Sequence, residues 1–163
     1  MTTTERAAAI RAALKAKGIS SRAVSVRSDS YSMGSSIDIC VKDPNVSLAT
    51  VKRLAEPHES IRRCEYSGEI LSGGNRYVSV TYTSEALDAL AARHIAAVEA
   101  AKLALEASSE NSLIPVGDTG YFLGNTNNGW GLSVWNQTSH VQQVSDAKGA
   151  AATIGARLVT EAA

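Results

Sequence analysis

The chain of 163 residues suits one domain or two very small ones, and its hydrophobic share of 44% excludes wholesale disorder. Lys and Arg equal Asp and Glu at 16 each, so no global field draws the protein to nucleic acid or to a membrane. No stretch approaches the roughly 20 apolar residues that span a bilayer. No apolar signal segment opens the chain, so we expect a cytoplasmic protein.

The charge is divided unevenly along the chain. Residues 1–63 carry 11 Lys and Arg and 6 Asp and Glu, whereas residues 64–163 carry 5 and 10. The two parts therefore bear net charges of +5 and −5. Such asymmetry can indicate a nucleic-acid contact by the basic part or a self-complementary homodimer, although two solvated surfaces are the simpler explanation.

A helix followed by a β-hairpin is expected first. Thr2 and Glu5 form a capping box, and apolar residues then recur at helical spacing, so residues 3–17 should be an amphipathic helix. The segments AVSVR and SIDICVK alternate apolar and polar residues, which predicts two strands with one buried face. The hydroxyl-rich stretch SVRSDSYSMGSSIDI, residues 25–39, contains their connection, which at about eight residues is longer than most hairpin turns.

A short helix, a second hairpin and a long helix should follow. Ser47 caps a helix at 47–56 that Pro57 stops, and EILSGGNRYVSVTYT predicts a hairpin with a glycine-rich turn. The strongest helical pattern runs from Glu85 to Ala107, and we expect its apolar stripe to pack on the first sheet. The stripe consists of Leu87, Ala91, His94, Val98, Ala101 and Leu105.

The remainder of the chain predicts a small sheet and a last helix. SSENS at 108–112 is the best linker, the segments LIPVG, TGYFLGN, GWGLSVWN and HVQQVS predict short antiparallel strands, and NTNNG predicts a tight turn. Ser145 should cap a final helix over 146–161. Its Gly149 and Gly155 weaken the helix, which suggests that they allow close packing on a sheet.

Together these elements predict an α+β protein in two parts. Residues 1–107 should form an antiparallel sheet with helices on one face, in the order α-β-β-α-β-β-α, with the long helix as the third. Residues 108–163 should form a small antiparallel β-sheet with a C-terminal helix, a ββββα subdomain packed on the first part.

The stretch ALKAKGISSRAVSVRSDSYSMGSSIDICVKDP and the later GGNRYVSV resemble one of the large polyvalent protein-associated domains of phages and conjugative elements. The shared features are the helix, the SVRSDSYS strand and loop, the SSIDI return strand and the Asp-Pro that follows. The resemblance covers residues 8–83, and the segment 57–75 departs from the family pattern. The resemblance implies a phage or mobile-element origin and action inside a bacterial host. It does not imply any particular catalytic activity.

Arg27, Asp29, Ser30 and Tyr31 form the first candidate binding site. The arginine and the hydroxyls could hold a phosphate, and Tyr31 could stack on a base. The structural alternative is that Asp29 and the serines bond their own backbone in Asx and Ser turns. In that case this stretch is only a long turn.

Two basic pairs, Lys52-Arg53 and Arg62-Arg63, form a second candidate. If they lie beside Arg22 and Arg27, they make a basic binding patch. Glutamates are interleaved with them and would offset their charge, so a solvated, salt-bridged surface is the simpler explanation.

Half of the aromatic residues, including both tryptophans, gather in the predicted C-terminal sheet, namely Tyr121, Phe122, Trp130 and Trp135. They could be a binding hot spot, or they could form the core of a small subdomain. Because Leu132 and Val134 share a face with Trp130 by alternation, Trp135 should point to the other face. Trp135 is therefore the predicted exposed anchor.

The sequence contains none of the common catalytic or metal-binding patterns. There is no nucleophile elbow, P-loop, dinucleotide fingerprint or HExxH spacing. Cys40 and Cys64 lack metal or CxxC spacing and should be free thiols. We therefore expect a non-enzymatic protein with no catalytic residues, no metal and no cofactor.

The leading hypothesis is an accessory protein of a phage or mobile element that binds a host protein, or a protein–nucleic acid complex, in the bacterial cytoplasm. An inhibitor of a CRISPR or restriction system would be one such protein. The alternative is a nucleic-acid-binding module that uses the basic N-terminal half, and an enzyme is least favoured. Salt dependence separates the first two, because phosphate contacts make binding steeply sensitive to salt.

Overall fold

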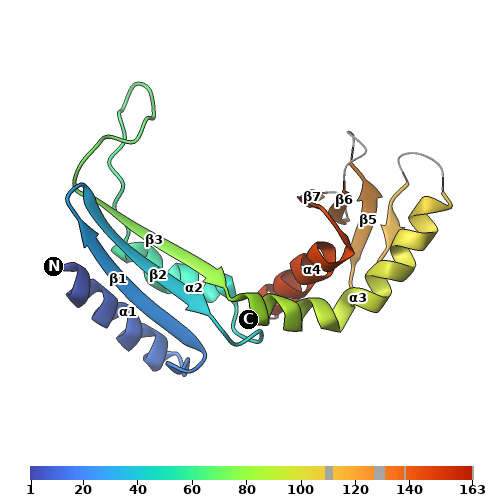
Figure 1. The fold of residues 1–163 in the computed structure, drawn as a ribbon, viewed down its shortest axis with the longest axis horizontal. Coiled ribbons are helices and arrows are strands. Elements are labelled where there is room, and N and C mark those ends of the chain that lie inside the picture. The colour runs from blue at the N-terminus through green and yellow to red at the C-terminus, as the bar shows by residue number, and fades with distance from the viewer. Residues whose placement is uncertain (109–111, 127–130, 138, 163) are drawn as a thin grey trace. The chain divides into compact units, whose positions relative to one another are not determined.

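The structure is a computed structural model that describes residues 1–108, 112–126, 131–137 and 139–162 (Figure 1). It divides into two compact units, Met1–Thr83 and Ser84–Ala163. The predicted α+β class is confirmed, with two sheets rich in antiparallel pairs and a C-terminal helix. Trp130, most of the expected linker and most of the expected NTNNG turn lie outside the described residues.

The first unit, all of whose residues are described, combines two α-helices with a three-stranded sheet. Its elements are α1 (Thr3–Ala16), β1 (Val24–Tyr31), β2 (Gly34–Val41), α2 (Leu48–Ala55), the 3-10 helix η1 (Glu56–His58) and β3 (Asn75–Tyr82). The order is β1-β2-β3, in which β1 and β2 pair antiparallel and β2 and β3 pair in parallel. Of the two strands expected in the second hairpin, only β3 joins this sheet. It pairs with β2 in parallel, because the chain crosses back through α2 before β3 begins.

The predicted alternation of the first hairpin is confirmed, because one face of the sheet is apolar and buried beneath α1 and α2. The buried apolar side chains of β1, β2 and the two helices are Val24, Val26, Ile37, Ile39, Val41, Ala7, Ile10, Leu14, Val51 and Ala55. Helix α1 lies mainly along β1, helix α2 lies along β3, and the two helices contact each other. The opposite face carries the alternate positions, among them Arg27 and Tyr31, and no helix of this unit covers it.

The second unit packs two helices on an antiparallel sheet. Its described elements are α3 (Ser84–Glu106), β4 (Ile114–Pro115), β5 (Tyr121–Asn125), β6 (Leu132–Asn136), β7 (Ser139–Val144) and α4 (Ala147–Glu161). The strands follow the order β4-β5-β6-β7, and α3 and α4 contact each other. One core joins both helices to β5 and β6, so this unit buries apolar surface of its own.

The long helix α3 belongs to the second unit. Its buried residues Val98, Ala101 and Leu105 share the core of β5, β6 and α4, so the expectation that this stripe packs on the first sheet is wrong. The two compact units meet between Thr83 and Ser84, not between residues 107 and 108. The helix covers the later sheet because that sheet would otherwise have only α4 to bury its apolar face.

The first turns of α3 bury a different side from the one predicted. Leu87 is 38% exposed, whereas Ala86 and Leu90 are buried. The reason lies in α4, where a Cβ added at Gly155 would lie 3.0 Å from the carbonyl oxygen of Leu90. The glycine therefore allows close packing of two helices, not of a helix on a sheet as expected.

Candidate protein-binding surface

All the exposed large hydrophobic side chains of the first unit belong to three segments: the start of α1, the β1–β2 turn and the segment between η1 and β3. They are Met1, Tyr31, Met33, Tyr66, Ile70 and Leu71, which we call the tip surface. The segments share one end of the sheet, because Ser30 Oγ donates to Thr3 Oγ1 at 2.9 Å and Gly34 pairs with Asn75. Elsewhere among the described residues only Leu87, Leu103 and Leu113 are large, apolar and exposed.

Residues 60–74 form an ordered arm that projects beyond the ends of the strands (Figure 1). Two backbone bonds connect its sides, from Cys64 N–H to the Glu69 carbonyl at 2.8 Å and from Leu71 N–H to the Arg62 carbonyl at 2.9 Å. Tyr66 lies in the turn of the arm and is 99% exposed. The ring of Tyr66 is therefore almost fully accessible to solvent, at the turn of a hydrogen-bonded arm.

Asn75 connects the base of the arm to the sheet. Its side chain is 3% exposed, accepts from the Arg62 N–H at 2.8 Å and donates to the Leu71 carbonyl at 2.7 Å. The backbones of Ser60 and Arg76 also exchange bonds of 2.8 and 2.9 Å. A buried amide that is bonded on both its oxygen and its nitrogen fixes direction, so the arm leaves the sheet in one orientation.

Arg6 is a buried residue of this end that the sequence analysis missed. It is 2% exposed, and its guanidinium donates to Ser35 Oγ at 3.0 Å and to the His58 carbonyl. Burial, together with the nearby charge of Arg76, lowers the pKa of Arg6. The spacing contained a signal, because Arg6 precedes Ile10 by one helical turn and so lies on the buried stripe of α1.

The predicted loop residues Arg27, Asp29, Ser30 and Tyr31 lie in strand β1. The ladder continues to the Tyr31–Gly34 pair, so the expected long connection is a turn of only two residues between the strands. The sequence did not predict a strand here, because a run of serines with few apolar neighbours is typical of loops. Pairing with the apolar strand β2 overrides that local preference.

The four residues divide into two pairs by what they contact. Asp29 Oδ1 accepts from the Ser30 N–H at 2.8 Å, and the Ser30 hydroxyl reaches Thr3, so these two side chains hold their own chain. Arg27 and Tyr31 point to the open face, where Arg27 lies opposite Asp38. Tyr31 alone of the four belongs to the tip surface.

The other predicted binding residues lie in two different places. Arg62 and Arg63 belong to the arm, and the exposed Arg63 side chain donates to the Gly68 carbonyl at 3.2 Å. Trp135 belongs to β6 of the second unit, where it is half-buried and meets the His140 ring edge-on at 5.2 Å. Arg62 and Arg63 are therefore neighbours of the tip surface, whereas Trp135 belongs to the other unit.

Cys64 occupies the turn of the arm and carries a perturbed thiol. Hydrogen bonds from the Ser67 hydroxyl, then from the backbone of Ser67 and Tyr66, lower its pKa to about 7. Cys40 lies on β2, and both cysteines are free. The arm thus presents a thiolate near neutral pH.

Alkylation of Cys64 by iodoacetamide should reach half its maximal rate near pH 7, because the thiolate is the reacting species. The rate should rise as pH increases through that value. Ser67→Ala should move the midpoint upward, towards the ordinary thiol range, because the largest stabilising hydrogen bond is lost. Peptide mass spectrometry in a Cys40→Ser background measures the rate, and an unchanged midpoint in the Ser67 variant would contradict this assignment.

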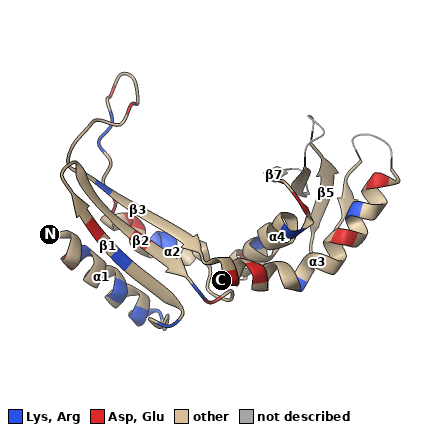
Figure 2. Ribbon diagram, viewed as in Figure 1, with Lys and Arg blue, Asp and Glu red and all other residues tan. Residues whose placement is uncertain are grey.

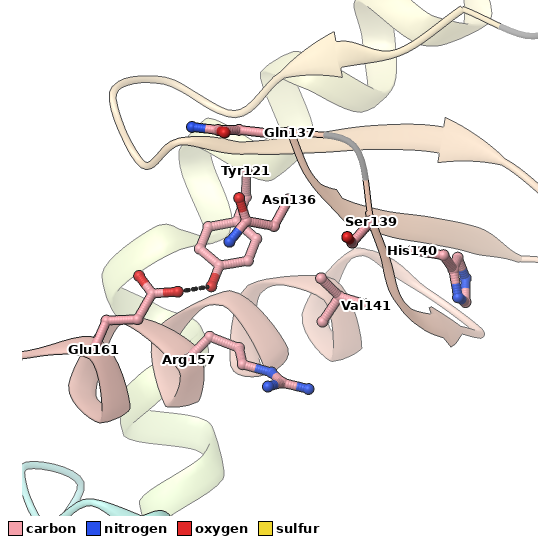
Figure 3. Close-up of a pocket in the computed structure, with 8 residues that line it drawn as sticks. All are labelled: Tyr121, Asn136, Gln137, Ser139, His140, Val141, Arg157 and Glu161. Carbon is pink, nitrogen blue, oxygen red and sulfur yellow. Dashed lines mark hydrogen bonds between the residues drawn. The ribbon is translucent and has the colours of Figure 1, made fainter.

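The second unit contains a polar hollow of about 380 Å³ beside the β6–β7 turn (Figure 3). The Tyr121 hydroxyl donates to Glu161 Oε1 at 2.5 Å, and burial followed by this bond raises the pKa of Tyr121 to about 12. Figure 3 shows Arg157 extending beside this pair. The bond joins β5 to α4, so we assign it a structural role that no sequence pattern indicated.

Within the described part of the chain, no group of three or more His, Cys, Asp and Glu side chains is placed to hold a metal. Over the same residues, no helix combines the length and the apolar character needed to cross a membrane. We find no match to this chain among models of protein families, among curated proteins or among solved structures.

Proposed function

We propose that the protein is a non-enzymatic binding protein whose first unit docks a partner protein through the tip surface. The observation that supports this most is the gathering of Met1, Tyr31, Met33, Tyr66, Ile70 and Leu71 at one end of a unit whose remaining large apolar residues are buried or half-buried. A group of exposed apolar side chains at one end of a unit favours an interaction site, whereas scattered single ones need no such explanation. Tyrosines beside arginines are also the residues that most often dominate binding energy.

Charge around the tip surface favours a partner with acidic groups. Arg62, Arg63 and Arg76 lie there, and every ion pair among the described residues lies in the second unit. Three nearby carboxylates accept hydrogen bonds of the protein itself: Asp29 from the Ser30 N–H, Glu59 from the Val78 N–H at 3.3 Å and Glu69 from the Ser67 hydroxyl at 3.3 Å. Arg63 donates to the Gly68 carbonyl, but none of the three arginines forms an ion pair with a described residue, so all three can pair with carboxylates of a partner.

The biological setting that we propose rests on the resemblance of residues 8–83 to large polyvalent protein-associated domains. Such domains act for phages or conjugative elements inside a bacterial host, so the proposed partner is a host protein in the bacterial cytoplasm. An inhibitor of a CRISPR or restriction complex is the specific form that we favour. We propose no cofactor and no metal for this activity.

The double change Tyr31→Ala and Tyr66→Ala should remove binding and leave the fold intact. Both rings are exposed, so unfolding free energy should change by no more than about 1 kcal/mol. Affinity for the partner should fall at least about tenfold, or 1.4 kcal/mol. The measurement compares host proteins captured by the wild type and by the variant, followed by titration of the purified partner.

Leu103→Ala is the matched control, because it removes an exposed apolar side chain from α3 in the second unit. It should leave the captured partner and its affinity unchanged. If the double variant remains folded and binds as well as the wild type, the tip surface is not the docking site.

Nucleic acid is the alternative partner, and the arginines near Tyr31 and Tyr66 are the observation in its favour. DNA binding by the wild type should then weaken steeply with salt, because each neutralised phosphate releases counterions. Protein binding centred on apolar contacts should depend on salt only weakly. A steep slope that Arg62→Ala and Arg63→Ala flatten would replace the proposed function with this one.

A further inference from the structure

A groove of about 580 Å³ lies between α1 and β1 in the first unit. Leu14, Val24 and Val26 contribute apolar surface to it, and the exposed Arg11 and Lys15 stand beside that surface. Helix α1 runs antiparallel to β1, so this groove and the tip surface occupy opposite ends of the strand. The groove is therefore a separate feature from the proposed docking site.

The groove runs beside a free sheet edge. β1 is the first strand of the order β1-β2-β3, and Arg11 Nη2 donates to the Val26 carbonyl at 2.6 Å. That carbonyl therefore points away from β2. In an antiparallel strand the N–H of the same residue points the same way, so Val26 presents a donor and an acceptor along this edge.

The other edge of the sheet is occupied by the chain itself. Ser60 bridges to Arg76 at the start of β3, and the Glu59 carboxylate accepts from the Val78 N–H. On β1 the Val26 carbonyl is held only by the long, flexible side chain of Arg11. A polar side chain on an edge strand blocks unwanted pairing, and it can also be displaced by a strand that offers it a better partner.

The charge beside the groove is of one sign. Arg11 and Lys15 line it, and no carboxylate does. Figure 2 shows basic positions recurring along α1, and Lys17 follows at the end of the helix. Carboxylates of a bound segment would therefore meet complementary charge on the helix side of the groove.

We propose that the groove binds an extended acidic segment of a partner protein, which adds to the edge of β1 as a fourth strand. An N–H of the segment takes the Val26 carbonyl, and the released Arg11 guanidinium pairs with a carboxylate of the segment. Alternate apolar side chains enter between Leu14 and Val24. Backbone bonds provide affinity, and the groove with its two cations provides sequence preference.

Selection of random displayed peptides against the full chain tests this proposal. Peptides that carry both apolar and acidic residues at alternate positions, so that both kinds face α1, should be enriched by the wild type and lost with Arg11→Glu plus Lys15→Glu. The best synthetic peptide should bind this double variant at least about tenfold more weakly. Lys17→Glu, a single charge reversal at the residue that follows α1 and outside the groove, should bind the peptide as the wild type does.

The mode of binding has its own test. N-methylation of alternate peptide amides on the side that faces β1 should abolish binding, and N-methylation on the other side should not, because only one side of a strand bonds the edge. If Arg11→Glu plus Lys15→Glu fails to fold, by circular dichroism, Arg11→Gln plus Lys15→Gln replaces it. The tip variants Tyr31→Ala and Tyr66→Ala should bind the peptide normally, so this proposal and the proposed function fail separately.

Four results would overturn the proposal. They are the absence of any enriched peptide, enrichment of peptides with helical spacing, equal binding by the Arg11 and Lys15 variants, and indifference to N-methylation. Measurement of the oligomeric state by analytical ultracentrifugation can give a further result that would overturn the proposal. A wild-type dimer that dissociates on changing Arg11 and Lys15 would show that a second copy of the chain occupies the groove.

Discussion

Replacing Val98 with aspartate should unfold the second unit. Val98 is completely buried and lies in the core that joins α3 to β5, β6 and α4. A carboxylate placed there has no cation of the core beside it, and a buried charge without a partner costs about 3–5 kcal/mol. That cost is a large share of the 5–15 kcal/mol by which domains are typically stable.

The measurement is thermal unfolding of the full chain together with amide NMR spectra. Signals of the second unit should collapse, and those of residues 1–83 should persist, because Val98 contributes to no core of the first unit. Leu103→Asp introduces the same group on the exposed side of α3 and should change stability by no more than about 0.5 kcal/mol. An unchanged melting temperature for Val98→Asp would show that the stripe is not buried.

The fate of α3 shows what a sequence pattern determines. After the first turns of the helix, the spacing of Ala91, Val98, Ala101 and Leu105 correctly indicated which side is buried, because helical periodicity is a local property. It did not indicate which sheet covers that side. A stripe of Ala, Val and Leu fits either sheet, so the choice depends on contacts with β5 and α4 that lie far along the chain.

Strand faces were predictable for a related reason. Val24, Val26, Ile37 and Ile39 alternate with polar residues, and alternation fixes the buried face before any partner is known. The length of the β1–β2 turn was not predictable, because the strand continues through serines whose local preference is for turns. Only the ladder with β2 shows that Tyr31 and Gly34 face each other.

The candidate surface was predictable in part. Tyr31, Arg62 and Arg63 were named from the sequence, because an aromatic or a pair of arginines among polar residues attracts notice. Tyr66 and Ile70 were not named, since single apolar residues in a polar segment carry no periodic signal. Their exposure follows from the ordered arm, which depends on the side chain of Asn75 in a later strand.

Gly34→Ala should destabilise the first unit by about 1–3 kcal/mol, the usual cost of forcing a group into a packed site. A Cβ at Gly34 would lie 2.4 Å from the carbonyl oxygen of Asn75, and this is a backbone atom that no rotamer change can move. The sign of the change in unfolding free energy is informative. At a site with room, Gly→Ala stabilises by about 0.4–1 kcal/mol because it restricts the unfolded chain.

The strain should reach the arm, because the crowded residue is the one that clamps it. Pushing the Asn75 backbone away from β2 displaces the side-chain amide that accepts from the Arg62 N–H and donates to the Leu71 carbonyl. The Arg62 N–H, and the Leu71 N–H that donates to the Arg62 carbonyl, should therefore exchange with solvent faster. Ser36→Ala, two residues along the same strand on the same face, adds no atom at the contact and should leave exchange in the arm unchanged. A Gly34→Ala protein as stable as the wild type would show that β2 and β3 do not approach this closely. The orientation of the arm would then have to depend on contacts other than the Gly34–Asn75 pair, and the tip surface would lose the clamp that orients Tyr66 for a partner.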